Sequence, residues 1–417
     1  QQQHGGELAS NPTWREENAR NKRRNSAPSP RRYQHQEERH KQQEQHHTTP
    51  AHSSTTSTVP EEPCSRKENP AAPQGRGVAT TAPPTVAGAP CPPAPVGGGS
   101  GGPLRFPMAT FSLALKVDDD GGSRFTLVSQ KTGRRWRAVD STRECQFGEV
   151  LRAVELTNGV VEAQEYFAIK ELSLDKLREM QGKTHEDPLR EVAALQYLPR
   201  HPNVLTCTEA LYDEDSIYVV TPFYSGGEVF DALAGRGRFD ESEARPLFRQ
   251  MLEGLLHLKT HGVCHRDVSL ENLVLAKGGV VKLIDFGLAL RIPQTADGRA
   301  VPLPPQGPCG KQYYMAPEVL ASASSSGFDG FAVDVWACGI VLFVMLTGVP
   351  LFELALPSRD QRCYIVSVEE RLADMLKEWQ VSPLSTEVTD LIQSCLLLAS
   401  ERRPSLETLL SNPWVNA

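Results

Sequence analysis

The chain has 417 residues, of which 39% are hydrophobic, and a formal net charge of −7 at pH 7, so it can form two or three domains with a buried core. The longest apolar run, "ACGIVLFVMLTGVPLF", is shorter than the roughly 20 residues of a membrane span and contains glycine and proline, so we expect no membrane segment. The 9 cysteines form no Cys-x-x-Cys pair, which favours free thiols in a reducing compartment, cytoplasmic or nuclear, over a disulfide-stabilised secreted protein.

Residues 1–107 differ in composition from the rest of the chain. They are rich in Gln, His, Pro, Ser, Thr, Ala and Gly and contain few large aliphatic side chains, so they cannot bury enough apolar surface to fold. The segment has a small excess of basic side chains but lacks the aromatic interleaving or RNA-binding signature of a nucleic-acid surface. We therefore predict a disordered low-complexity tail, with a solvated linker favoured over a nucleic-acid contact.

A β-rich region follows this tail. Residues 108–133 form a poorly defined lead-in, and from 134 to 221 the segments "RRWRAV", "GEVLRAVEL" and "EYFAIKEL" have the pattern of strands. Asn158-Gly159 suits a hairpin turn between the second and third of these segments. One helix is expected within the region, at "LREVAALQYL", preceded by an N-cap aspartate and a proline at the first helical position.

The remaining sequence, 226–415, is mainly helical in pattern. "ESEARPLFRQMLEGLLHL" carries apolar residues at helical spacing and is followed by Gly262, which suits a helix end. "AVDVWACGIVLFVMLTG" is apolar nearly all round, which predicts a helix in the centre of a domain.

Three polar side chains follow apolar segments in a way that suits phosphoryl transfer. This reaction needs divalent metal on the nucleotide phosphates, a cation beside them and a base that orients the attacking hydroxyl. Asp285, after the strand-like "VVKLI", is a candidate Mg²⁺ ligand, and Asn272 offers a neutral oxygen to a second ion. Asp267 is the candidate base.

Lys170 and Glu191 are a candidate ion pair. Lys170 ends the apolar segment "YFAIK", and a solvated lysine there is common. Glu191 shares a helix face with Leu195 and Leu198, so its carboxylate faces an apolar interface and requires a buried cation. We predict that Lys170 is this partner and that the pair holds the lysine against the phosphates.

The ordered motifs "AIK", "REV", "HPNV", "HRDVSLEN", "DFG", "YMAPE" and "DVWACG" make residues 134–415 similar to a eukaryotic-type protein kinase catalytic domain. The resemblance implies an α+β, bilobal fold, with a small β-rich N-lobe carrying one regulatory helix and a larger, mainly helical C-lobe. The implied N-lobe is 134–222, the hinge 222–225 and the C-lobe 226–415.

The resemblance also implies a set of site residues and the cofactors ATP and Mg²⁺. Lys170 contacts phosphates, Glu191 holds Lys170, Asp267 acts as the base, and Asn272 and Asp285 bind metal. The implied nucleotide-contacting residues further include Phe147, Gly148, Val150, Ala168, Thr221 as gatekeeper, Phe223 in the hinge, Glu228, Glu271 and Val274. In the same way, Glu318 and Arg403 are expected to form a buried ion pair, and Asp334 to anchor the catalytic loop.

The sequence departs from the family pattern at several positions. Arg143 and Cys145 stand where the glycine-rich loop has glycines, which limits close approach of backbone to phosphate. Ser269 replaces a lysine that in serine/threonine kinases helps to hold the transferred phosphate, and Arg143 is one candidate for a compensating cation. Lys311 replaces a threonine found in many of these kinases. "PQGP" stands where the activating phosphate usually lies, so Arg266 lacks an expected phosphothreonine partner.

These features favour a protein serine/threonine kinase that transfers the γ-phosphate of ATP to protein hydroxyl groups. "SLEN" and "YMAPE" resemble that class, and the region before "HRD" is similar to calcium/calmodulin-dependent kinases. The acidic residues Glu228 and Glu271 suggest protein substrates that are basic around the acceptor. The alternative is a pseudokinase that acts as a nucleotide-binding or scaffold protein, because of the departures at Arg143, Cys145, Ser269 and Lys311.

Overall fold

The computed structural model describes residues 102–118, 125–157, 160–295, 300–321, 327–379 and 384–417. For residues 160–164 it describes the backbone only. The disorder predicted for 1–107 therefore falls almost wholly outside the described residues, as does the predicted Asn158-Gly159 turn. The last residues of the predicted tail do make contacts. The Leu104 amide donates a hydrogen bond to the Arg291 carbonyl at 2.9 Å, and the Phe106 ring lies edge-on to Tyr197 at 5.8 Å.

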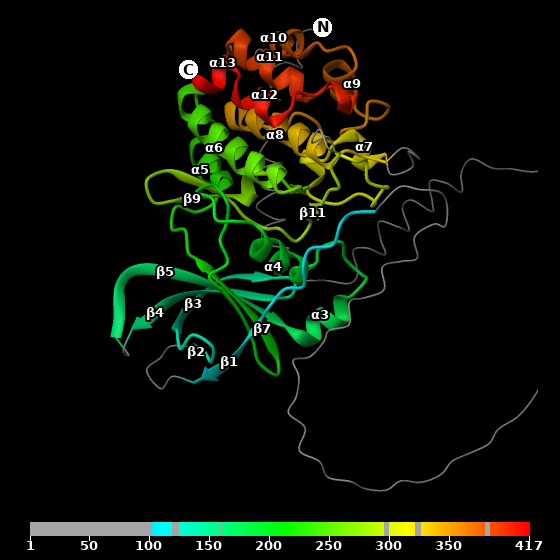
Figure 1. The fold of residues 1–417 in the computed structure, drawn as a ribbon. Helices are drawn as coiled ribbons and strands as arrows, with labels where there is room; N and C mark the ends of the chain where they lie inside the picture. The colour runs from blue at the N-terminus through cyan, green and yellow to red at the C-terminus, as the bar shows by residue number, and fades with distance from the viewer. Residues whose placement is uncertain (1–101, 119–124, 158–159, 296–299, 322–326, 380–383) are drawn as a thin grey trace, which may run out of the picture. The chain divides into compact units, whose positions relative to one another are not determined.

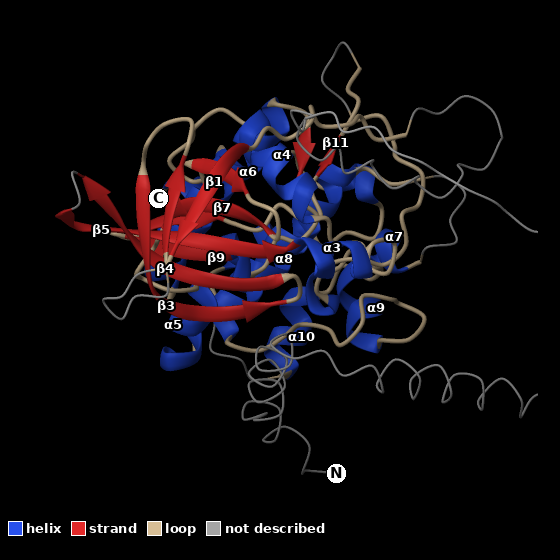
Figure 2. Ribbon diagram, turned by 90° about the horizontal axis from the view of Figure 1, so that it is seen from below, coloured by secondary structure: helices blue, strands red, loops and turns tan. Residues whose placement is uncertain are grey.

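Seven strands form a closed barrel in the order β1-β2-β3-β4-β5-β7-β6 (Figures 1 and 2). Neighbouring strands pair antiparallel except for β1 and β6, which pair parallel. Leu127, Trp136, Leu151, Ile169 and Leu211 fill its interior and are fully buried. The strands are β1 Ser112–Val117, β2 Thr126–Ser129, β3 Arg135–Cys145, β4 Gly148–Thr157, β5 Val160–Ser173, β6 Glu209–Tyr212 and β7 Ser216–Pro222.

Strands β1 and β2 lie within 108–133, which the sequence pattern left as a poorly defined lead-in. Of the six residues of β1 only Ala114 is buried, whereas Leu113 and Leu115 are 43% and 52% exposed. The larger apolar side chains thus lie on the outer face, and the usual rule that they mark the buried face fails here. Pairing with β2 and β6 stabilises this strand, and such pairing is not visible in a local pattern.

Two helices, rather than the expected one, lie between β5 and β6: α3 Leu174–Met180 and α4 Pro188–Tyr197. The prediction of α4 is confirmed, because the Asp187 carboxylate accepts hydrogen bonds from the Leu189 and Arg190 amides. The expectation of a single helix is wrong because α3 is too short to show a helical repeat. It is instead capped by the Ser173 hydroxyl and held by burial of Leu174.

The rest of the described chain is mainly helical, and its larger helices lie apart from the barrel strands in Figure 1. Helix α6 begins with a capping box, in which Asp240 and Glu243 each bond the other's backbone amide. The elements after the barrel are α5 Val229–Arg236, α6 Glu241–Thr260, β8 Val263–Cys264, η2 Leu270–Asn272, β9 Leu273–Ala276, β10 Val280–Leu283, β11 Leu290–Arg291, η3 Gln312–Tyr314, α7 Pro317–Leu320, α8 Gly330–Thr347, α9 Gln361–Ser367, α10 Leu372–Glu378, α11 Thr386–Cys395, η4 Ser400–Arg402, α12 Leu406–Leu410 and α13 Pro413–Asn416.

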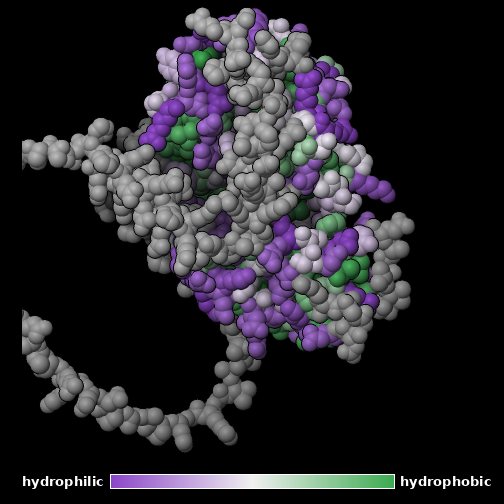
Figure 3. Space-filling model, turned by 180° about the vertical axis from the view of Figure 1, so that it is seen from behind, coloured by the Kyte–Doolittle hydropathy of each residue, from purple (hydrophilic) through white to green (hydrophobic). Residues whose placement is uncertain are grey.

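Helix α8 is the core helix that its apolar sequence predicts. Of the described helices, only α8 has the length and hydropathy that a membrane span requires, yet 89% of it is buried within the protein. The side chains of Trp336 and Phe343 on this helix are fully buried. Hydrophilic residues prevail on the described surface seen from behind (Figure 3), with smaller hydrophobic areas between them.

Candidate active site

Lys170 of β5 and Glu191 of α4 form the predicted ion pair, with Nζ 2.5 Å from Oε2. Glu191 is 5% exposed, so its charge has little access to water. Burial opposes the charged form of Lys170, but the nearby Glu191, Asp285 and Glu186 outweigh burial and raise the pKa of the ammonium. Lys170 therefore stays protonated, and three carboxylates surround one ammonium.

Asp334 of α8 anchors the loop that follows β8, as predicted. The Asp334 carboxylate accepts hydrogen bonds from the His265 and Arg266 amides, each at 2.8 Å. Arg266 adopts a φ of 66°, a conformation that costs a non-glycine residue free energy and that these two bonds hold in place. The Arg266 guanidinium, without the phosphothreonine that its family counterpart contacts, donates to the Cys309 thiol and lies over the Phe328 ring.

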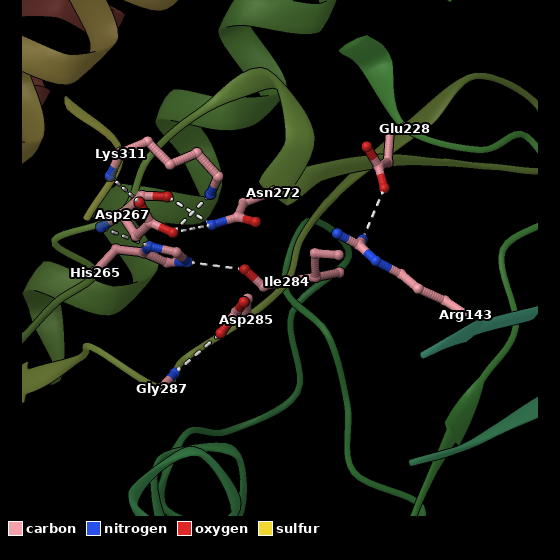
Figure 4. Close-up of polar contacts among 9 residues, drawn as sticks. All are labelled: Arg143, Glu228, His265, Asp267, Asn272, Ile284, Asp285, Gly287 and Lys311. Atoms are coloured by element: carbon pink, nitrogen blue, oxygen red, sulfur yellow. Dashed lines mark hydrogen bonds and ion pairs between the residues drawn. The ribbon is translucent and has the colours of Figure 1, made fainter. Parts of the chain in front are cut away.

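Asp267 and Asn272 lie together at the end of this loop (Figure 4). The Asn272 amide nitrogen donates to Oδ2 of Asp267 at 2.7 Å and to the Asp267 carbonyl at 2.8 Å. These two bonds orient the Asp267 carboxylate and fix the side chain of Asn272, leaving its amide oxygen for another ligand. Two of the predicted site residues, separated in sequence by the segment "VSLE", are thus in direct contact.

Asp285 follows β10 and lies close to the same group. Its φ is 65°, and its carboxylate accepts a hydrogen bond from the Gly287 amide at 3.2 Å. Burial acts to raise the pKa of this carboxyl, but the charges of Lys170 and Lys311 outweigh it, so the pKa lies below the usual value and Asp285 is ionised. The backbone before Asp285 is held by His265, whose ring nitrogen bonds the Ile284 carbonyl at 3.0 Å.

One basic and one acidic residue to which the sequence analysis gave no role, Lys311 and Glu186, also lie beside Asp267 and Asp285. Lys311, between β11 and η3, donates from Nζ to Oδ2 of Asp267 at 2.7 Å and from its amide to Oδ1 at 3.1 Å. Glu186 lies beside Asp285 and Gly287, and burial together with repulsion by Asp285 raises the pKa of Glu186 to about 7. No local motif marks Glu186, whereas Lys311 is visible as a departure from a familiar pattern.

The β3–β4 connection is a two-residue turn, because Cys145 pairs with Gly148. Phe147 is 2% exposed and packs with Leu172 and Val192. Gly148 lies against the Glu171 carbonyl, where a side chain has no room, so close strand packing accounts for this glycine. Packing thus explains both residues, and their contact with a nucleotide stays a prediction.

Arg143 of β3 points to Glu228, and its guanidinium lies 3.1 Å from a carboxylate oxygen (Figure 4). The arginine side chain is 47% exposed. It lies apart from Asp267 in the view of Figure 4, so the structure does not bring this cation to the group formed by Asp267 and Asn272.

The residues predicted to surround a nucleotide base lie on the barrel strands and the segment after them. Val150 is opposite Lys170 in the β4–β5 pair, and Ala168 is opposite Thr221 in the β5–β7 pair. The other predicted residues are placed by individual contacts. Val274 and Glu228 form an isolated antiparallel β-bridge, and the Phe223 amide donates a hydrogen bond to the Tyr166 carbonyl at 2.9 Å. Glu271 lies near enough to Lys311 for their charges to interact.

The oxygen donors of this site fit Mg²⁺ in kind. Asp285 supplies an ionised carboxylate and Asn272 an amide oxygen, which are ligand types that Mg²⁺ prefers when phosphates complete its coordination. No group of three or more His, Cys, Asp or Glu side chains suited to a metal ion occurs among the described residues.

Comparison with known proteins gives a family match. The family model described as "Protein kinase domain" matches residues 144–415. The chain is 34% identical over 236 residues to CBL-interacting serine/threonine-protein kinase 24 of Arabidopsis thaliana, covering 55% of this chain and 47% of the relative. It is 33% identical over 273 residues to Serine/threonine-protein kinase cds1 of Schizosaccharomyces pombe, covering 64% of this chain and 55% of the relative.

A third relative, CBL-interacting protein kinase 21 of Oryza sativa subsp. japonica, is 38% identical over 224 residues, covering 54% of this chain and 38% of the relative. The chain thus spans about half or less of the length of these relatives. The family match at residues 144–415 includes all the ordered sequence motifs.

Proposed function

Because the chain belongs to the protein kinase domain family, we propose that it transfers the γ-phosphate of ATP to serine or threonine hydroxyl groups of proteins. The observation that carries this proposal is one connected group of side chains. Lys170 is paired with Glu191, and Asp285 lies near enough to Lys170 for their charges to interact. Asp267 is oriented by Asn272. These residues come from separate elements, and phosphoryl transfer needs each of them.

In the proposed reaction each residue has one task. Lys170, held by Glu191, binds nucleotide phosphates; Asp285 and Asn272 hold Mg²⁺, which when bound neutralises the charge on the phosphates. Asp267 orients the substrate hydroxyl and accepts its proton. Since Asn272 holds the Asp267 carboxylate by a bond of 2.7 Å, the base is aligned before the substrate arrives.

We further infer that the barrel and the helical region act as the small and large lobes of a bilobal kinase, joined at 222–225. The adenine ring then lies among Val150, Ala168 and Val274. Pro222 has no amide hydrogen and the Phe223 amide is bonded to Tyr166, so the amides of Tyr224 and Ser225 are the hinge donors that we assign to adenine. Glu228 and Glu271 are the acidic groups that favour substrates with basic residues near the acceptor.

We place the protein in the cytoplasm or nucleus on the basis of its thiols. The seven cysteines of the described residues are all free, and five of them are buried. A reducing compartment keeps such thiols from oxidation.

The test is phosphate transfer from radiolabelled ATP with Mg²⁺ to a generic basic protein, using the full chain. Lys170→Met and Asp285→Asn serve as comparison proteins. We expect incorporation by the wild-type chain and a loss of at least about 100-fold in each variant, because each removes a charge that the transition state requires. Equal incorporation in all three samples would contradict a kinase and favour the scaffold alternative.

A further inference from the structure

The loop that carries Asp267 contains no cation of its own in the place where the family lysine lies. Ser269 stands there, its side chain is fully buried, and its hydroxyl has no hydrogen-bond partner in the described part of the chain. The transferred phosphoryl group carries negative charge over three oxygens and approaches Asp267, itself a carboxylate. A cation beside Asp267 is therefore needed to offset this repulsion.

Lys311 places an ammonium at that point from a different segment of the chain. Its Nζ lies 2.7 Å from Oδ2 of Asp267, and its amide bonds Oδ1 of the same carboxylate at 3.1 Å (Figure 4). The two bonds fix both ends of this residue relative to Asp267. The side chain of Lys311 is 33% exposed, so it is only partly buried.

The surroundings keep Lys311 charged. Burial opposes the ammonium, but Asp267, Glu271 and Asp285 outweigh burial and raise the pKa of Lys311 above its ordinary value. Asp267 is the one of these carboxylates that Lys311 contacts directly, and Asp285 also interacts with Lys170. An ammonium so placed can contact a phosphate oxygen without losing its bond to Asp267, because it has three donor hydrogens.

The other candidate cation lies elsewhere. Arg143 makes an ion pair with Glu228 at 3.1 Å, and this pair is separate from the Asp267 group in Figure 4. Lys170 is paired with Glu191 on the barrel side. Of Arg143, Lys170 and Lys311, Lys311 is the one in direct contact with the proposed base.

We propose that Lys311 is the catalytic cation that holds the transferred phosphoryl group at Asp267, in place of the charge that Ser269 lacks. The inference rests on the proposed kinase function. In this step the bond between the γ-phosphorus and the bridging oxygen of ADP breaks, a bond from the substrate hydroxyl oxygen to phosphorus forms, and the hydroxyl proton passes to Asp267. The ammonium of Lys311 contacts a γ-phosphate oxygen throughout and exchanges no atom.

Transfer kinetics of the full chain test this assignment, with Lys311→Met compared with a matched lysine, Lys377→Met, which lies exposed on α10. We expect Lys311→Met to lower kcat by about 10- to 1000-fold, by analogy with loss of one donor to a developing oxyanion, and to raise KM for ATP by about 10-fold, because the contact to the γ-phosphate is also made in the bound substrate. Lys377→Met should leave both constants unchanged. Wild-type kcat in Lys311→Met would overturn the proposal.

Moving the positive charge from position 311 to position 269 distinguishes a catalytic role of Lys311 from a role in anchoring the loop. Lys311→Thr should lose activity, and adding Ser269→Lys to it should restore at least about 10-fold, because the ammonium returns to the same phosphate from the catalytic loop. If Ser269→Lys restores nothing while both proteins keep the thermal unfolding midpoint of the wild type, Lys311 is an anchor of the activation segment and the proposal fails.

A binding measurement gives a readout that does not depend on turnover. With Mg²⁺ present, calorimetric titration compares ADP with the non-hydrolysable β,γ-methylene analogue of ATP. We expect the wild type to prefer the triphosphate and Lys311→Met to lose about 10-fold of that preference at unchanged affinity for ADP. A preference that persists in Lys311→Met overturns the inference. No transfer by the wild type, with the preference still dependent on Lys311, overturns the kinase function and supports the phosphate contact.

Discussion

Two buried ion pairs in this protein differ in how completely their charges are satisfied. In the helical region, Arg403 has a fully buried side chain and binds Glu318 through both terminal nitrogens, at 2.6 and 2.9 Å. Its remaining donors reach the carbonyls of Leu397, Ala332 and Leu398. In the barrel, Lys170 has Glu191 as its hydrogen-bond partner and lies among further carboxylates.

The difference separates a structural pair from a pair prepared for a ligand. Every donor of Arg403 is used within the protein, so no group is left for a ligand, and the desolvation of its charge is offset by fixed partners. Around Lys170 more than one carboxyl group accompanies a single ammonium, an arrangement that phosphates and Mg²⁺ would complete under the proposed function. The same chemistry of cation and carboxylate thus serves folding in one region and, under that proposal, binding in the other.

The largest effect on this comparison is expected from Arg403→Met. The substitution leaves Glu318 and three backbone carbonyls without their donor, and breaking a buried pair on one side costs about 3–5 kcal/mol. Denaturant unfolding of the full chain measures this loss. Arg402→Met is the matched control, since Arg402 is 58% exposed in its pair with Glu370 and solvent screens such a pair. Equal losses in the two variants would contradict the structural assignment.

Lys170→Met should show the opposite balance, with a smaller loss of stability and a larger loss of function. Burial already raises the pKa of Glu191, so this carboxyl takes up a proton once the ammonium is removed. The expected loss of transfer is at least about 100-fold, which corresponds to about 3 kcal/mol in the barrier. Denaturant unfolding and phosphate transfer, measured on the same preparation, test these two expectations. A stability loss as great as that of Arg403→Met would end the distinction.

Asp360 sharpens the comparison because backbone amides, not chiefly a cation, satisfy its carboxylate. The side chain accepts hydrogen bonds from the amides of Glu353, Arg362 and Cys363, and despite its burial these bonds hold its pKa below the ordinary value. Its contribution to stability is therefore complete above the ordinary aspartate pKa of about 4 and is lost as pH falls through the lower folded value.

Asp360→Asn should therefore cost about 2 kcal/mol at pH 7 and should flatten the decline in stability below about pH 4. Unfolding followed from pH 7 to pH 3 checks both effects. Parallel pH curves for the variant and the wild type, at any offset, would contradict this account of the carboxylate.

The smallest effect is expected at Arg143, whose ion pair with Glu228 is largely exposed on the arginine side. Arg143→Ala should change the unfolding free energy by less than about 1 kcal/mol. It should also change KM for ATP by less than about threefold, because the structure directs this arginine to Glu228. A KM increase of tenfold or more would return Arg143 to the role of the compensating cation, at the expense of Lys311.

Much of the fold and site could be predicted from local patterns. Asp187 and Pro188 predict the start of α4, the uniformly apolar sequence of α8 predicts its burial, and the ordered motifs predict the family. The pairing of Lys170 with Glu191 could be predicted because a glutamate on the apolar face of a helix requires a buried cation. In each case the residues within one or two segments contain the physical reason.

Other features were decided by tertiary contacts. Strand β1 is stabilised by pairing with β2 and β6 while its larger apolar residues face outward, so its own sequence does not indicate its place. Gly148 is constrained by the carbonyl of a neighbouring strand, although its sequence context suggested a phosphate. Such constraints arise between chain segments far apart in sequence, and a local pattern does not contain them.

The amino-acid sequence by itself determined which chemical groups this protein possesses: a candidate base, oxygen donors of the kind that Mg²⁺ prefers, lysines and carboxylates. Only the tertiary structure decided which cation accompanies which acid, directing Arg143 to Glu228 and Lys311 to Asp267. The physical reason is that electrostatic attraction depends on distance in the folded chain and not on separation along it.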